Sequence, residues 1–168
     1  MKIRIVVALS IALLCSGGVL AQAEKQVIAI RGDVGAINKA ARTYKKKIKM
    51  VEGVSLEGTE ASYFTSRAGE LKKITAKMYG ETFNGSAELY YKGGELIFCY
   101  IKINKYDTQI GMTPPPKVVR VEEERYYFGN GELIRVLAGK KEIKPGDERY
   151  GELKDGTLEL TKTLKEAF

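Results

Sequence analysis

Histidine and tryptophan are absent from the 168 residues, and cysteine occurs only twice, at Cys15 and Cys99. Without histidine, the chain has no Ser–His or Cys–His nucleophile pair and no imidazole ligand for a metal. The sequence also lacks a glycine-rich phosphate loop ending in Lys-Ser or Lys-Thr, a dinucleotide-binding fingerprint and an Asp-rich calcium loop. We therefore expect no catalytic residues, no cofactor and no metal, and a non-catalytic role is favoured over an enzyme.

Long apolar runs are scarce too. The run at residues 5–15 is too short for a membrane span, which takes ~20 residues. It follows a basic start and precedes the small residues Ala21 and Ala23, which is the pattern of a secretory signal peptide with an A-x-A cleavage site. We expect residues 1–23 to be this signal peptide, with cleavage after Ala21 or Ala23, and residues 24–168 to be one exported domain, periplasmic or secreted, without a transmembrane segment.

The two cysteines bear on anchoring and on disulfides. Lipid-anchored bacterial precursors are cut before a cysteine that follows a small residue, but Leu14 precedes Cys15, so we expect no lipid anchor. Cleavage leaves Cys99 alone, which excludes an intramolecular disulfide. Because Cys99 lies in an apolar strand segment, the sequence predicts a buried thiol.

The formal net charge is +7 and the sequence pI is about 9.3, with the basic residues spread along the chain. Export argues against a nucleic acid as the partner of this charge. Anionic components of the cell envelope, or an envelope protein, are the partners that we expect. The oligomeric state stays open.

Periodicity predicts an α+β fold with an N-terminal helix, an antiparallel meander of about six strands and a short C-terminal helix. Apolar residues spaced by three and four indicate a helix over residues 26–44, with the lysines at residues 45–49 following its end. Thr157 is the expected N-cap of the C-terminal helix. The predicted strands are 58–65, 70–79, 85–92, 95–106, 118–128 and 132–138.

An internal repeat organises these strands into hairpins. Aromatic pairs precede glycine turns, and Gly-Glu-Leu opens the next strand at Gly69, Gly94 and Gly131. The turns Gly93-Gly94 and Asn130-Gly131 favour tight hairpins, because both accept positive φ. Counting outward from Gly93-Gly94 pairs Leu89 with Phe98 and Tyr90 with Ile97. Counting outward from Asn130-Gly131 pairs Tyr126 with Arg135, on the same face as Leu89 and Phe98. That face is mostly apolar, and we expect it to carry the N-terminal helix.

The opposite face mixes aromatic and charged side chains. In the structural interpretation, the tyrosine rings on this face pack in the core while their hydroxyl groups reach water. In the functional interpretation, the sheet is curved and these tyrosines bind a ligand. In the functional interpretation, Tyr90 and Tyr127 stack on a ligand or partner, Arg125 binds a carboxylate or phosphate, and Glu88 fixes orientation. A non-catalytic binding or interaction module of the bacterial cell envelope is the function that this pattern favours.

Two alternatives remain. A carboxylate-based envelope hydrolase could use Glu122 and Glu124, which share a strand face. An exported inhibitor-type protein could dock through the connection at residues 108–117, where Thr113 precedes three prolines that exclude a central strand.

The hairpin segments at residues 90–97 and 126–134 resemble those of uncharacterised exported bacterial proteins with a signal peptide, a helix and a Tyr-rich antiparallel sheet, and residues 73–82 are similar to another segment of that group. They also loosely resemble MORN-like repeats, although the Gly-Glu-Leu units here are unevenly spaced. The resemblance covers about residues 58–138 and implies the architecture rather than an activity.

Overall fold

The computed structural model describes residues 16–168, so most of the predicted signal peptide lies outside the described residues. The elements, in chain order, are α1 (Ser16–Ala40), a 3₁₀ turn (Ala41–Thr43), β1 (Lys45–Val51), β2 (Thr59–Thr65), β3 (Leu71–Gly80), β4 (Phe83–Lys92), β5 (Glu95–Tyr106), β6 (Val118–Gly129), β7 (Glu132–Ala138), β8 (Lys141–Ile143) and α2 (Glu148–Glu166).

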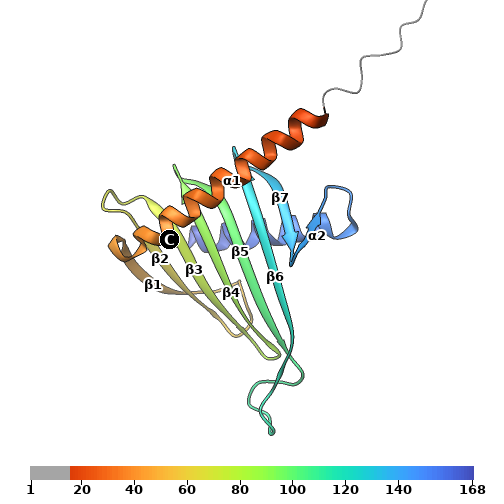
Figure 1. The fold of residues 1–168 in the computed structure, drawn as a ribbon. Helices are drawn as coiled ribbons and strands as arrows, with labels where there is room; N and C mark the ends of the chain where they lie inside the picture. Colours follow the sequence, from red (N-terminus) through yellow and green to blue (C-terminus); the bar gives the residue numbers. More distant parts are fainter. Residues whose placement is uncertain (1–15) are drawn as a thin grey trace, which may run out of the picture.

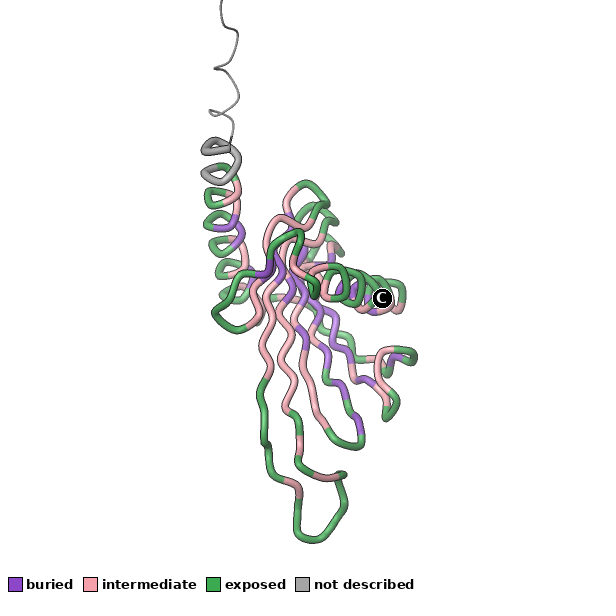
Figure 2. The backbone as a smooth tube through the Cα atoms, turned by 90° about the vertical axis from the view of Figure 1, so that its right-hand side faces the viewer, coloured by how far each residue is buried: buried purple, intermediate pink, exposed green. Residues whose placement is uncertain are grey.

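The eight strands form one sheet in sequential order, and each strand pairs antiparallel with the next. Helix α1 crosses one face of the sheet diagonally and α2 crosses the other face (Figures 1 and 2). The predicted α+β class and meander are therefore confirmed. The predicted number of six strands is wrong, because β1 and β8 extend the sheet at its two edges.

Strand β1 contains the lysines that we expected at the end of the N-terminal helix. The helix ends at Ala40 rather than at residue 44, and Ile48 pairs with Ser62 of β2. Lysines suit a sheet edge, because their charge opposes pairing with another chain. The other edge strand, β8, is only three residues long and begins to pair where Ala138 faces Lys141.

Each of the three Gly-Glu-Leu repeats carries a β-bulge at the same place. The residue after the leucine has no partner on the neighbouring strand, and these residues are Lys72, Ile97 and Ile134. One extra residue shifts the register beyond it, so Leu89 pairs with Cys99 and not with Phe98. Likewise Tyr126 pairs with Val136 and not with Arg135.

The bulges decide which helix covers which face, and our expectation for the faces is wrong. Beyond the bulges, Leu89, Cys99 and Tyr126 lie on the face that packs on α2. Phe98 is turned to the face of α1 instead, where it packs with Tyr127. The apolar face thus carries the C-terminal helix, and the mixed face carries the N-terminal one.

Helix α2 is longer than predicted. It begins at Glu148, so Thr157 lies inside the helix, buried against the sheet, and is not its N-cap. Sheet side chains hold its C-terminal end: the Tyr63 hydroxyl donates to the Leu164 carbonyl at 3.0 Å, and Lys49 Nζ donates to the carbonyls of Ala167 and Phe168. These bonds satisfy carbonyls that the last turn of a helix leaves without partners.

Candidate functional site

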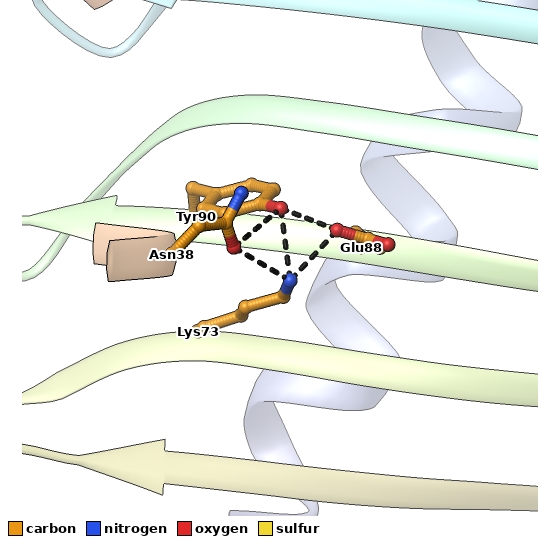
Figure 3. Close-up of polar contacts among 4 residues, drawn as sticks. All are labelled: Asn38, Lys73, Glu88 and Tyr90. Carbon is orange, nitrogen blue, oxygen red and sulfur yellow. Dashed lines mark hydrogen bonds and ion pairs between the residues drawn. The ribbon is translucent and has the colours of Figure 1, made fainter. Parts of the chain in front are cut away.

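A closed polar cluster lies between α1 and the sheet (Figure 3). Lys73 of β3 and Tyr90 of β4 are register partners, and Glu88 lies two residues before Tyr90 on the same face. Lys73 Nζ donates to Glu88 Oε2 at 2.7 Å, to Tyr90 Oη at 2.9 Å and to Asn38 Oδ1 of α1 at 2.9 Å. The Tyr90 hydroxyl contacts both Asn38 and Glu88.

Every donor of the Lys73 ammonium group is used in this cluster, since an ammonium has three. Lys73 also lies over the Tyr90 ring, 4.7 Å from its centroid. Burial alone would raise the pKa of Glu88, but the hydrogen bonds from Lys73 and Tyr90 outweigh it and hold that pKa below its ordinary value. Burial, reinforced by the hydrogen bond to Glu88, raises the pKa of Tyr90. The cluster is a satisfied ion pair that fastens α1.

The two tyrosines of the predicted binding face are covered by α1. Tyr90 is 2% exposed and Tyr127 is 3% exposed. Tyr127 packs with Val27 and Ile30 of the helix, and Arg31 Nε donates to its hydroxyl at 3.4 Å. A partner could reach either ring only after α1 left the sheet. In this fold both tyrosines support the helix.

The other two predicted residues lie further along the same face, at the border of the area that α1 covers. Glu88 pairs with Tyr100 of β5, and Tyr100 pairs with Arg125 of β6. The Arg125 guanidinium lies 5.2 Å from the centroid of the Tyr100 ring and forms an ion pair of 2.9 Å with Glu123. Sequence reasoning missed Tyr100, because the bulge after Leu96 reverses the face on which it lies.

The carboxylates of the hydrolase alternative are both engaged. Glu122 pairs with Arg120 at 3.0 Å. The Tyr126 hydroxyl donates to Glu124 Oε2 at 2.6 Å, and Arg149 of α2 lies 3.8 Å from the other oxygen. Each carboxylate therefore has a cation beside it, which is the arrangement of surface ion pairs.

The far end of the β5–β6 hairpin projects beyond the rest of the sheet, where neither helix covers it (Figures 1 and 2). It carries five exposed large apolar side chains: Ile110, Met112, Val118, Val119 and Val121. Single exposed apolar residues are ordinary, but a group on one projecting element indicates an interaction surface. We refer to residues 107–122 as the hairpin end.

One edge of β6 is unpaired within the hairpin end. Strand β7 accompanies β6 only as far as the pair Glu124–Ala138, and the Gly139 amide then donates to the Glu123 carbonyl at 2.7 Å. Backbone groups alternate in direction along a strand, so the amide and carbonyl of Val121 face the same open side as the Glu123 carbonyl. A notch of about 210 Å³ marks the place where β7 ends, lined by Arg120, Val121, Glu122, Glu123, Glu124, Ala138, Gly139 and Arg149.

Comparisons of the chain with protein-family models, with curated proteins and with solved structures found no match. Within residues 16–168, none of the helices has the length and apolar character needed to cross a membrane. The same part of the chain contains no group of three or more cysteine, aspartate or glutamate residues placed to hold a metal ion.

Proposed function

We propose that this protein is a non-catalytic interaction module of the bacterial cell envelope that binds a partner protein through its hairpin end. The observation that carries the proposal is the coincidence of exposed apolar side chains with an unpaired strand edge on one projecting element. The two edge strands of the sheet are less suited to strand addition: β1 exposes Ile48 and Met50 but is rich in lysine, and β8 is very short.

The partner fits as an extended segment that adds a strand to β6. Its backbone would bond to the open amide and carbonyl of Val121, and its apolar side chains would pack on Val119 and Val121. Arg120 and Glu122 lie on the other face of the strand and would favour a segment with charges of both signs. The added strand would begin at the notch beside Gly139, where β7 ends.

The envelope location rests on the predicted signal peptide at residues 1–23, of which residues 1–15 lie outside the described part of the chain. The net positive charge supports it, because anionic envelope components would attract a basic exported protein. Such attraction weakens as salt is raised, whereas strand addition with apolar packing persists.

The test is crosslinking and capture from envelope extract with the mature protein, followed by binding assays with the purified partner. The variant Val119→Lys/Val121→Lys places charge on the open strand edge. Its matched control is Ile48→Lys/Met50→Lys, since all four side chains are more than half exposed and the control pair lies on β1 at the other edge. We expect the first variant to lose the partner and the second to retain it.

Equal binding by both variants would overturn the proposal. Deletion of residues 113–116 separates strand addition from the inhibitor-type alternative. If that deletion abolishes binding while Val119→Lys/Val121→Lys leaves it intact, the proline loop, and not the strand edge, is the docking element.

A further inference from the structure

A second pocket lies at the opposite end of the strands from the hairpin end, between α2 and two hairpin turns. Its volume is about 390 Å³, within the ~300–1,000 Å³ typical of small-molecule sites. Its lining residues are Tyr91, Gly94, Glu95, Leu96, Phe128, Gly131, Leu158, Thr161, Lys162 and Lys165.

The floor of this pocket is apolar. Tyr91 and Phe128 are buried in the core beneath α2, and Leu96 packs against the same core. Leu158 of α2 lines the wall of the pocket and is 40% exposed. The apolar parts of these side chains could therefore receive a chain or ring of a ligand.

Glycines keep the rim of the pocket open. Gly94 and Gly131 each occupy the second position of a two-residue turn with positive φ, 80° and 78°. A Cβ atom added at either position would meet no atom within 4 Å, so open space lies beside both turns. The turn type thus requires glycine and also leaves room at the rim.

Positive charge lines one wall. Lys162 and Lys165 are three residues apart on α2 and both border the pocket. Lys165 Nζ donates to the Gly94 carbonyl at 3.1 Å, which uses one of its three donors, and Lys162 is 4.0 Å from Glu166. Glu95 borders the pocket too, but its register partner Lys92 binds Asp33 of α1, so its side chain belongs to the other face.

We propose that this pocket binds an anionic amphiphile: a carboxylate attached to an apolar chain. The carboxylate lies between Lys162 and Lys165, where charge-assisted hydrogen bonds are available to it. The chain lies along Leu96, Phe128 and Leu158, which removes its surface from water. This site is independent of the partner-binding surface in the proposed function, because the two lie at opposite ends of the sheet.

The experiment is a titration of the mature protein with octanoate, by calorimetry and by NMR, with 1-octanol and octyltrimethylammonium as neutral and cationic analogues. The variant Lys162→Met/Lys165→Met removes both charges while keeping side-chain length, and Lys154→Met on the same helix is the matched control. Thermal unfolding and circular dichroism establish that each variant is folded. We expect saturable octanoate binding, about tenfold weaker in the double variant and unchanged in the control.

Two further arms make the result specific. Leu158→Asp places a carboxylate beside the pocket and should weaken octanoate by about tenfold or more, while its exposed position spares the fold. Octyltrimethylammonium should not compete with octanoate for the wild-type protein. The proposal is overturned if octanoate does not saturate the wild-type protein, if the double variant binds octanoate as well as Lys154→Met does, or if the cationic analogue binds equally well.

Discussion

Lys73 and Glu88 form an ion pair across β3 and β4, with 2.7 Å between Nζ and Oε2, and the lysine is buried beneath α1. Replacing Glu88 by Gln should destabilise the fold by about 1–3 kcal/mol, because it leaves the buried ammonium without its counter-ion. Chemical denaturation measures this free energy of unfolding. The exposed pair Lys77–Glu60, at 3.2 Å, supplies the control: Glu60→Gln should cost no more than about 0.5 kcal/mol. Equal losses would show that Lys73–Glu88 is an ordinary surface pair.

The same carboxylate should make stability depend on pH. The pKa of Glu88 is below its ordinary value in the folded protein, so the folded state binds fewer protons there than the unfolded state does. The contribution of the Glu88 carboxylate to the free energy of unfolding is therefore present above the unfolded pKa of about 4.3. It is lost as the pH falls through the lower folded pKa. Denaturation series between pH 7 and pH 2.5 should show a smaller acid loss for Glu88→Gln than for the wild type. Parallel curves would contradict this role.

Two neighbouring tyrosines should respond in opposite ways to loss of the hydroxyl. Among residues 16–168 the buried Tyr91 hydroxyl has no hydrogen-bond partner, whereas the Tyr63 hydroxyl donates to the Leu164 carbonyl. Tyr91→Phe should leave stability unchanged or raise it by about 1 kcal/mol, because an unsatisfied buried group is removed. Tyr63→Phe should cost about 1 kcal/mol and loosen the end of α2. Thermal unfolding of the two variants measures both changes in stability. A larger loss of stability for Tyr91→Phe than for Tyr63→Phe would reveal a partner for the Tyr91 hydroxyl.

The two candidate cleavage sites, after Ala21 and after Ala23, both precede Val27, where the buried contacts of α1 with the sheet begin. Processing at either site therefore keeps Val27, Ile30 and the cluster at Asn38. Expression in a bacterial host should give an envelope-located product that begins at Gln22 or Glu24, as measured by fractionation and intact mass. A full-length product retained inside the cell would contradict the predicted signal peptide.

The strand positions followed from the sequence more readily than the faces did. Positive φ at Gly93, Gly94, Asn130 and Gly131 is what the turn dipeptides require, and the hairpins form where they predict. The bulges at Ile97 and Ile134 have no comparable signal, because an isoleucine suits a paired or an unpaired strand position equally well. One unpaired residue moves every later side chain to the other face, so a correct turn still gave the wrong partner for Leu89.

The candidate site was harder to predict for a related reason. Tyr90, Tyr127, Glu88 and Arg125 do share a face, but which helix covers that face depends on the bulges. The unpaired edge of β6 depends on where β7 ends, and the sequence of β6 carries no sign of its partner's length. The available signal in the sequence was the group of valines at the start of β6, Val118, Val119 and Val121. Valine in a strand is expected at buried positions more often than at open ones, so valines beside a long connection indicate a surface that a partner covers.

Cys99 offers a probe of global opening, because it lies in the middle of the sheet and is fully buried. The prediction of a buried thiol is confirmed. Burial raises the pKa of this thiol, so very little of the reactive thiolate forms at neutral pH.

We expect the folded mature protein to resist a thiol-directed maleimide and to react fully in denaturant. Because the Cys99 side chain lies on the face of the sheet that packs on α2, reaction requires that the core beneath this helix open. The labelling rate of the native protein should therefore fall with each stabilising variant and rise with Glu88→Gln. Fast labelling at a rate that does not change among these variants would mean that α2 leaves the sheet locally, without unfolding of the whole domain.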